Sequence, residues 1–230
     1  MHDHRSITPG GDADGRPAAG RWSLAAATPA LLVAGVLALV AVVTWPLREA
    51  VYVTVAPAVA TSPVAAAVAG TLAQRGPLLL VALAAVLVVV TVLRDRPAFW
   101  TLVAGGAGVI GAYLISAGVK LLVAEQRPCQ VWEVSTVLTC PAVGDWSWPS
   151  NHSLVAAAFA TACMLAVPRT AWLAVPVAVL SGLARLAAGV HYLHDVAAGL
   201  ALGTAVVVVV VLLLRRVTRS GWPPPSGPAR

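Results

Sequence analysis

Residues 195–214 read DVAAGLALGTAVVVVVVLLL, a run in which the one charged side chain, Asp195, comes first. An α-helix rises 1.5 Å per residue, so about 20 helical residues cross the ~30 Å hydrocarbon core of a lipid bilayer. The run therefore predicts a membrane-spanning helix with a carboxylate at one end. A charge beside a span is energetically costly, which makes it a candidate functional group.

Five more apolar stretches precede it, near residues 24–45, 77–93, 98–119, 152–168 and 171–190. Hydrophobic residues make up 59% of the 230-residue chain and charged residues only 10%, which is far from the composition of soluble domains. The sequence predicts an all-α, polytopic membrane helix bundle with six transmembrane helices in one domain, residues 23–215. The polar segments 1–22 and 216–230 lack hydrophobic periodicity and are predicted to be disordered tails.

The distribution of basic residues predicts the orientation of this bundle. Cytoplasmic segments are enriched in Lys and Arg, and six spans with an inside amino terminus give ten basic residues inside against five outside. The inside set is Arg5, Arg16, Arg21, Arg94, Arg96, Arg169, Arg215, Arg216, Arg219 and Arg230, and the outside set is Arg48, Arg75, Lys120, Arg127 and Arg185. We therefore expect a multi-pass protein of the plasma membrane with both tails in the cytoplasm.

Within residues 46–76, the stretch 50–73 is apolar as well, but its two prolines and its hydroxyl side chains weaken it as a span. A seventh span there would also move Arg94 and Arg96 outside, which the charge rule disfavours. We expect an extracytoplasmic interfacial or re-entrant helical segment, and the sequence leaves open whether it acts as a lid.

The net charge of +6 does not indicate nucleic-acid binding, because the basic residues lie between apolar runs and form no basic face with interleaved aromatic side chains. Cys129 and Cys140 share one polar loop, so a disulfide and two unrelated thiols are both compatible with the sequence. No cysteine pair has the spacing of a metal site.

Seven ionisable residues fall at the outer ends of the third to sixth predicted spans: Lys120, Arg127, His152, Arg185, His191, His194 and Asp195. The predicted orientation rests on arginine counting and not on the chemistry of these seven residues. That it places them all at one membrane level is therefore an independent indication that they share a site.

The segment KLLVAEQRP, residues 120–128, has Lys120 and Arg127 seven residues apart, on one face if the helix continues that far. Two cations on one face favour an anion, although both side chains can also extend to lipid headgroups. The segment WPSNHS, residues 148–153, offers Ser150 as a helix N-cap whose neighbouring backbone N–H groups suit a phosphate, with His152 beside it. An interfacial histidine bonded to a loop is the alternative for His152.

The segment RLAAGVHYLHD, residues 185–195, carries His191 and Asp195 four residues apart, which on a helix are offset by about 40°. Asp195 can then hold one ring nitrogen of His191 and leave the other free to attack. His194 ranks second as nucleophile, because it points about 60° away from His191 around the helix. A structural His–Asp pair between spans is the other interpretation.

Together these segments closely resemble the motifs K-x6-R-P, P-S-G-H and S-R-x5-H-x3-D of the type 2 phosphatidic acid phosphatase (PAP2) superfamily. The matching residues are Lys120, Arg127 and Pro128, then Pro149, Ser150 and His152, then Arg185, His191 and Asp195. Asn151 stands in place of the usual glycine and Ala184 in place of the usual serine. The resemblance covers roughly residues 75–215 and implies a core like that of this superfamily and the related haloperoxidases.

The resemblance also implies a chemistry. His191 would attack phosphorus to form a phosphohistidine, Asp195 would stabilise the imidazolium, and His152 would protonate the leaving oxygen and then activate water. The groups that would hold the anion are Lys120, Arg127, Ser150, Arg185 and backbone amides near Asn151.

The predicted function is metal-independent hydrolysis of a membrane lipid phosphate or pyrophosphate at the outer face, without a cofactor. We expect no metal, because Asp195 is the only carboxylate expected near the outer span ends within the motifs. The family uses phosphatidic acid, phosphatidylglycerol phosphate and polyprenyl pyrophosphate, and an outward site favours an undecaprenyl-type pyrophosphate used in cell-envelope synthesis. A lipid phosphotransferase and an organic-anion transporter are the alternatives. The sequence does not determine the oligomeric state.

Overall fold

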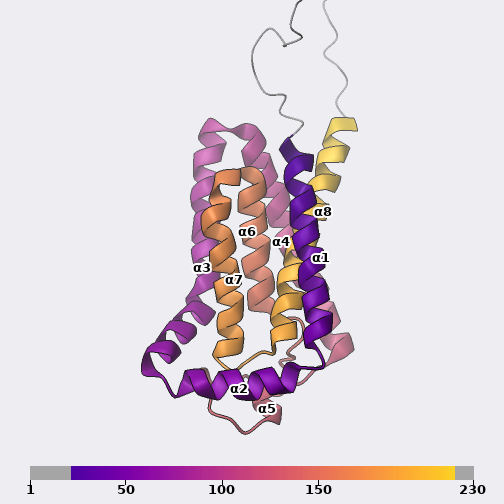
Figure 1. Ribbon diagram of the computed structural model, residues 1–230. Coiled ribbons are helices and arrows are strands. Elements are labelled where there is room, and N and C mark those ends of the chain that lie inside the picture. The colour runs from indigo at the N-terminus through magenta and orange to yellow at the C-terminus, as the bar shows by residue number, and fades with distance from the viewer. Residues whose placement is uncertain (1–21, 221–230) are drawn as a thin grey trace, which may run out of the picture.

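The structure, a computed structural model, describes residues 22–220, and every regular element in that range is helical (Figure 1). The elements are α1 (Trp22–Thr44), α2 (Arg48–Ala60), α3 (Pro63–Arg94), α4 (Arg96–Val123), α5 (Pro128–Val131), α6 (Asn151–Ala166), a 3-10 turn (Pro168–Thr170), α7 (Ala171–Ala187) and α8 (Leu193–Ser220). The predicted all-α class is confirmed.

The two predicted tails fall mostly outside the described residues. The amino-terminal tail, predicted over 1–22, overlaps them only at Trp22, where α1 begins. The carboxy-terminal tail was predicted to begin at residue 216, which is wrong, because α8 continues to Ser220. Arginine is a good helix former, so the basic residues after Leu214 extend the helix beyond its apolar part.

Within the described residues, five helical segments are long and apolar enough to cross a membrane: Ala27–Thr44, Pro63–Arg94, Arg96–Val131, Pro168–Ala187 and Leu193–Val217. Large apolar side chains such as Leu32, Leu93 and Trp172 are exposed on these helices, as expected for surfaces that contact lipid. The remaining predicted span, residues 152–168, corresponds to α6, which has only 16 residues. The chain is a multi-pass membrane bundle, and its count of six spans stays a prediction.

The short helix α6 lies at the centre of the bundle, in contact with α3, α4, α7 and α8 (Figure 1). Gly199 and Gly203, one turn apart on α8, allow its close approach. A Cβ atom on Gly199 would lie 2.5 Å from the carbonyl oxygen of Ser150, and one on Gly203 would collide with that of Leu154. Small residues at helix contacts are typical of membrane bundles. The contact fixes the beginning of α8 against the beginning of α6, where two of the motif segments meet.

Helix α2 lies across one end of the bundle, and α3 then runs along the length of the bundle (Figure 1). Helix α3 begins directly after Ser62, whose Oγ accepts a hydrogen bond from the backbone N–H of Ala65, and Pro63 occupies the first helical position. The boundary predicted at residue 76 is therefore wrong, because residues 63–76 belong to the same helix as residues 77–94.

The ends of the bundle differ in charge. Helix α1 begins and α8 finishes at one end, and α2 and α5 lie at the other (Figure 1). The first end has Arg94, Arg96, Arg169, Arg215 and Arg216, and the second has Arg48, Lys120, Arg127 and Arg185. This arrangement agrees with the separation obtained from arginine counting. Arg5, Arg16, Arg21 and Arg230 lie outside the described residues.

A disulfide joins Cys129 and Cys140, with their Cα atoms 5.8 Å apart. Of the two possibilities that the sequence left open, the structure has the bonded one. The bond closes the segment around α5 at the end of the bundle that also carries α2 (Figure 1). The third cysteine, Cys163, is buried in α6 as a free thiol.

Candidate active site

The three motif segments meet at the end of the bundle that carries α2 and α5. Lys120 lies in the last turn of α4, Ser150 caps α6, and Arg185 lies in the last turn of α7. Of the motif residues, Lys120, Arg127, Ser150, Arg185, His191 and Asp195 are buried, Asn151 is half-buried and His152 is exposed. The predicted convergence of separate segments at one level is thus present in the fold.

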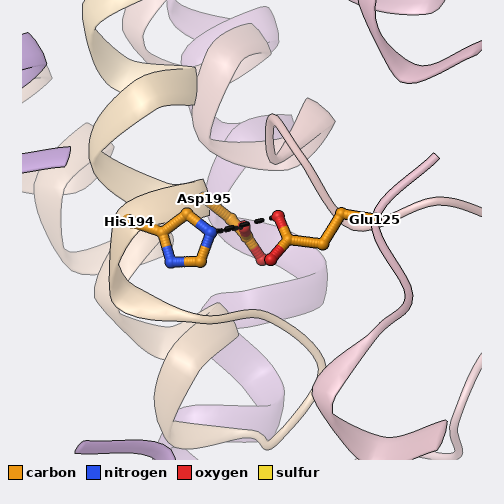
Figure 2. A group of neighbouring side chains, drawn as sticks. All are labelled: Glu125, His194 and Asp195. Atoms are coloured by element: carbon orange, nitrogen blue, oxygen red, sulfur yellow. Dashed lines mark hydrogen bonds and ion pairs between the residues drawn. The ribbon is translucent and has the colours of Figure 1, made fainter. Parts of the chain in front are cut away.

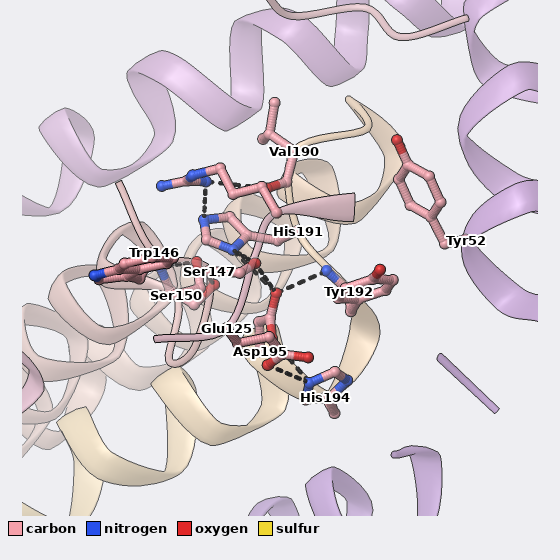
Figure 3. A network of polar contacts seen from close by, with 12 residues as sticks. Tyr52, Glu125, Trp146, Ser147, Ser150, Val190, His191, Tyr192, His194 and Asp195 are labelled. Atoms are coloured by element: carbon pink, nitrogen blue, oxygen red, sulfur yellow. Dashed lines mark hydrogen bonds and ion pairs between the residues drawn. The ribbon is translucent and has the colours of Figure 1, made fainter. Parts of the chain in front are cut away.

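His191 is held by Asp195, but not along a helix face (Figure 3). His191 lies two residues before α8, and Asp195 lies in the first turn of that helix. Asp195 Oδ2 reaches back to His191 Nδ1 at 3.2 Å and accepts a hydrogen bond from the backbone N–H of Tyr192 at 2.8 Å. An acidic side chain that reaches back to the N–H before its own helix is a capping arrangement. The predicted contact is present, but the helical geometry from which we predicted it was wrong.

The other ring nitrogen of His191, Nε2, lies 2.9 Å from Arg127 Nη1. A guanidinium has only donors, so Nε2 is the acceptor and the ring proton is on Nδ1. Burial lowers the pKa of His191 to about 3; the charges of Arg127 and Arg185 act in the same direction, and Asp195 opposes them. His191 therefore has a neutral ring with a lone pair on Nε2, which is the form that a nucleophile requires.

Arg127 is fixed by chain acceptors on all of its nitrogens. Nε donates to the carbonyl oxygen of Asp145 at 2.7 Å, Nη2 to Asp145 Oδ1 at 2.9 Å, and Nη1 to the carbonyl oxygen of Val190 at 3.0 Å. Burial raises the pKa of Asp145, but the hydrogen bond and charge of Arg127 outweigh it and hold that pKa below its usual value. An anion that binds Arg127 must replace some of these acceptors.

Lys120 contacts the same loop. Its Nζ donates to the carbonyl oxygens of Trp146 and, at 3.3 Å, Ser147. Helix α4 ends at Val123, and Ala124 takes a left-handed conformation with φ 48°. The helix therefore does not reach Arg127, and the condition under which Lys120 and Arg127 would share one helix face is not met. The two cations converge because the chain turns at Ala124 and both side chains then reach residues 145–147.

Arg185 differs from the other two cations of the motifs. Only 6% of the residue is exposed, yet its guanidinium makes no hydrogen bond or ion pair within residues 22–220, and its Nε is buried without a partner. A buried charge without a partner is energetically costly. Such a side chain is typical of a site that binds an anion.

The beginning of α6 carries the second motif. Ser150 Oγ accepts hydrogen bonds from Ser153 N at 3.5 Å and Ser153 Oγ at 3.0 Å, so the predicted N-cap is confirmed. The backbone N–H of Ser150 donates to the carbonyl oxygen of Asp195 at 3.1 Å, which ties α6 to α8. Asn151 Oδ1 accepts a hydrogen bond from Ser116 Oγ of α4 at 2.7 Å. Ser150 and Asn151 thus also hold the helices together, whereas His152 is accessible.

Three further residues complete the site. Asp145 binds Arg127, the hydroxyl of Ser147 donates to Asp195 Oδ2 at 2.5 Å, and Glu125 contacts His194. Asp145 and Ser147 lie in the loop between α5 and α6, where no periodic pattern fixes the position of a side chain. Glu125 offered a signal, because it is an ionisable residue inside KLLVAEQRP at the same span end as Lys120.

Glu125, His194 and Asp195 form a group (Figure 2), and Asp195 connects it to His191 (Figure 3). His194 Nε2 lies 3.1 Å from Glu125 Oε2 and 3.0 Å from Asp195 Oδ1. One ligand atom from each residue lies within 4.8 Å of the others, a spacing that can hold a metal ion. The expectation that Asp195 is the only carboxylate here was therefore wrong, because the turn after α4 brings Glu125 to the same level. Metal-independent activity stays a prediction.

Comparison with known proteins connects this geometry to a family. Residues 101–219, just over half of the chain, match the PAP2 superfamily. The chain belongs to this superfamily. The matched range contains all three motif segments, which meet at the end of the bundle that carries His191.

Several relatives of this PAP2 protein are named phosphatases. The chain is 33% identical to a lipid A 1-phosphatase of Rhizobium etli over 132 residues, which are 50% of this chain and 57% of that protein. It is 36% identical to a decaprenylphosphoryl-5-phosphoribose phosphatase of Mycobacterium tuberculosis over 103 residues, 44% of this chain and 54% of that protein. It is also 36% identical to an undecaprenyl-diphosphatase of Sulfolobus acidocaldarius over 86 residues, 37% of this chain and 41% of that protein. The matches thus span about half the length of these relatives.

The fold also matches a solved structure, a transmembrane PAP2 type phosphatidylglycerolphosphate phosphatase from Bacillus subtilis. The TM-score is 0.54, and the match covers 86% of this PAP2 protein and 98% of the other chain at 20% identity. At that identity the likeness shows a shared transmembrane fold.

Proposed function

We propose that this PAP2 protein hydrolyses a lipid phosphate or pyrophosphate through a phosphohistidine on His191, without a metal ion. The observation that carries the proposal is the unprotonated Nε2 of His191 in contact with the buried guanidinium of Arg127, near a second buried guanidinium, Arg185, whose charge acts on the same ring and which has no acceptor within the described residues. An unprotonated nucleophile beside fixed cations suits attack on an anionic phosphoryl group. Phosphoryl transfer depends mainly on positioning and charge neutralisation, and such cations provide both.

In the first step, the lone pair of His191 Nε2 forms a bond to phosphorus as the bond from phosphorus to the leaving oxygen breaks. The ring becomes positive, with its proton still on Nδ1, where Asp195 stabilises it through the 3.2 Å contact. Arg127 releases Nε2 and binds phosphate oxygens instead, together with Arg185. His152, exposed at the beginning of α6, donates a proton to the leaving oxygen.

In the second step, a water molecule attacks phosphorus as His152 accepts its proton. The bond between phosphorus and Nε2 breaks, and its electron pair returns to His191. Inorganic phosphate leaves, and Arg127 returns to its 2.9 Å contact with Nε2.

The proposed substrate is a lipid. The site lies at the end of a membrane bundle, so a phosphorylated headgroup can enter it while the hydrocarbon chain remains in the bilayer. Relatives named for lipid A, decaprenylphosphoryl-5-phosphoribose and undecaprenyl diphosphate support the same class. Among lipids we favour a polyprenyl phosphate or pyrophosphate of the undecaprenyl type.

In this proposal the site faces the outside of the plasma membrane. Two observations support that side. The other end of the bundle carries five described arginines, as the positive-inside rule requires of the cytoplasmic end. The disulfide Cys129–Cys140 lies at the end that carries the site, and disulfides persist in oxidising compartments. An outward site is where a lipid carrier is released after cell-envelope synthesis.

The test is phosphate release by the purified protein in detergent from a panel of lipid phosphates and pyrophosphates, with and without excess EDTA. We expect at least one lipid to be hydrolysed, EDTA to have no effect, and His191→Ala to abolish turnover. Arg185→Ala should reduce turnover by at least about a hundredfold, the scale of loss of a group that stabilises transition-state charge. Arg75→Ala, which changes an exposed arginine outside the site, is the matched control and should retain activity.

The same experiment separates the alternatives. Transfer of labelled phosphate to an acceptor other than water, without release of inorganic phosphate, would identify a phosphotransferase. Full function of His191→Ala would favour the transporter, which needs cations but no nucleophile. Loss of activity in EDTA that Mg²⁺ restores would contradict the metal-independent mechanism.

A further inference from the structure

The carboxylate of Asp195 uses its two oxygens very differently (Figure 3). Oδ2 contacts three groups: the backbone N–H of Tyr192 at 2.8 Å, the Ser147 hydroxyl at 2.5 Å and His191 Nδ1 at 3.2 Å. Oδ1 is buried and makes no well-aligned hydrogen bond, and the polar atom that faces it is His194 Nε2, 3.0 Å away. The orientation of Asp195 on this side therefore depends on His194.

His194 is itself held tightly. Its residue is fully buried, and its Nε2 lies 3.1 Å from Glu125 Oε2. The ring lies against the Tyr192 ring, with centroids 5.4 Å apart and planes 17° apart, and against the Trp45 ring at 4.5 Å. One ring nitrogen is thus fixed between two carboxylates, and the aromatic neighbours leave the ring little freedom to turn.

Glu125 connects this buried group to the surface. It is half-buried and borders a cavity of about 180 Å³ that is also lined by Arg48, Gln126, Trp132 and Tyr192. Helix α2 and the turn after α4 thus meet at this cavity, beside the buried pair. The order of contacts from the surface inward is Glu125, His194, Asp195 and then the nucleophile.

We propose that Glu125 and His194 are positioning residues, which hold Asp195 in the orientation that keeps the proton of His191 on Nδ1 and the lone pair on Nε2. The inference rests on the proposed role of His191 as nucleophile. His194 donates its Nε2 proton toward the two carboxylates, and Glu125 fixes the imidazole from the other side. Loss of His194 removes the one polar atom that faces the buried Asp195 Oδ1, and with it the charge-assisted contact of 3.0 Å, which favours rotation of the carboxylate away from His191.

The first measurement concerns the ring of His191 and needs no substrate. In the full-length protein with ¹⁵N-labelled histidine, His191 should give the signals of a neutral ring protonated on Nδ1, with assignment from His191→Gln. His194→Leu, which puts an apolar side chain of similar size in place of the imidazole and so removes the donor, should shift the Nδ1 proton signal or mix the two tautomers. His194→Gln places an amide nitrogen where Nε2 lies and should restore most of the wild-type signal.

The second measurement concerns catalysis. His194→Leu should lower kcat by about tenfold or more, the scale found when a residue that orients a catalytic group is lost, with KM within about twofold. His194→Gln should recover kcat to within about threefold of the wild type, since the amide restores the donor. Glu125 is half-buried, and Glu125→Gln keeps the shape of its side chain. This variant should shift the His191 signal in the same direction as His194→Leu and should lower kcat less than His194→Leu does. Gln126→Leu, in the same cavity lining, is the matched control and should change neither quantity.

Clear results would overturn the proposal. Unchanged His191 signals and unchanged kcat in both His194→Leu and Glu125→Gln would exclude a positioning role, as would equal losses in His194→Leu and His194→Gln. Stoichiometric binding of Zn²⁺ by the wild type, lost in Glu125→Gln, would make the group a metal site instead. If the wild type hydrolyses no lipid phosphate, the proposed function fails, whereas the ¹⁵N measurement still decides the positioning role. If His194→Leu does not fold, Glu125→Gln gives both readouts.

Discussion

Arg127 is the residue for which the chain and the proposed substrate compete. Its guanidinium donates to Asp145 through Nη2 and Nε and contacts His191 through Nη1. The side chain of Asp145 is 54% exposed, so this ion pair is screened by solvent and contributes modestly. Asp145 therefore places Arg127 without binding it too strongly to be displaced.

The first prediction follows from this competition. Asp145→Asn removes the charge that phosphate must displace, so inorganic phosphate should inhibit lipid hydrolysis at about threefold lower concentration, the range expected of an exposed ion pair. Glu133→Gln, an exposed carboxylate outside the site, should leave the inhibition constant unchanged. Weaker inhibition in Asp145→Asn would show that Asp145 is needed to orient Arg127 rather than competing for it.

The second prediction concerns the charge of His191. With a pKa of about 3 the ring stays neutral at pH 5, where an ordinary histidine would be almost fully protonated. Titration of ¹⁵N-labelled protein from pH 8 to pH 4 should leave the His191 nitrogen signals unchanged. A midpoint near pH 6.5 would contradict this.

The same shift in the pKa of His191 has a consequence for stability. Because its folded pKa lies below its unfolded value, the unfolded chain takes up a proton that the folded chain does not. This residue therefore makes the fold less stable as the pH falls from about 6.5 toward 3.

For single residues, the sequence predicted which side chains take part in the chemistry better than it predicted which atoms contact one another. Lys120, Arg127, Arg185, His191 and Asp195 could be selected because ionisable residues beside apolar spans are rare. The partners Asp145 and Ser147 could not, since they lie in an irregular loop whose path depends on the fold. The contact between Arg127 Nη1 and His191 Nε2 likewise depends on the turn at Ala124. Rules based on residue spacing do not predict that turn.

At the scale of elements, the site depends on how closely α8 approaches α6. Gly203 faces the backbone of α6 at Leu154 and Ala158, so any added side-chain atom must push the two helices apart. The first turn of α8 carries Asp195, and the first turn of α6 carries His152, so separation of these helices would also disturb the catalytic groups.

The third prediction tests this packing. Gly203→Ala should lower the free energy of unfolding by about 1–3 kcal/mol, the usual cost of overpacking, and should reduce kcat. Gly106→Ala, on α4 with no atom within 4 Å of the added Cβ, is the matched control and should be neutral or slightly stabilising. Thermal unfolding in detergent measures the difference. Equal midpoints for the two variants would show that the contact yields easily.

The helices themselves were predictable because their lengths follow from bilayer thickness. Their ends were less so. The break before α3 is made by Ser62 and Pro63. Both are common residues, so their presence alone does not mark the beginning of a helix. The four-residue spacing of His191 and Asp195 suggested a helix, whereas the contact forms because Asp195 caps the beginning of α8 from within.

At the scale of the whole molecule, the orientation in the membrane determines which lipids can reach the site. Arginine counting predicts this orientation, and Arg94, Arg96, Arg169, Arg215 and Arg216 do lie at the opposite end of the bundle from Arg48, Arg127 and Arg185. The disulfide at the end that carries the site is an independent indication of the same orientation.

The fourth prediction is that this end is extracytoplasmic. In intact cells, a maleimide reagent that does not cross membranes should modify the protein only after treatment with an impermeant reductant, at Cys129 and Cys140. A variant with both cysteines replaced by serine should not react, because Cys163 is buried. Modification that requires cell lysis would place the site in the cytoplasm and would exclude an outward-facing carrier lipid as substrate.

The contact between Arg127 and Nε2 of His191 also bears on selectivity toward inhibitors. A neutral alkylating agent that diffuses in from the bilayer meets a lone pair already covered by a guanidinium, and it offers that guanidinium no better acceptor. Only a compound with a strongly anionic group beside its reactive centre can draw Arg127 aside and uncover the imidazole. Covalent inactivators of this protein should therefore carry a phosphate-mimicking anionic group that displaces Arg127, with the electrophile placed next to it.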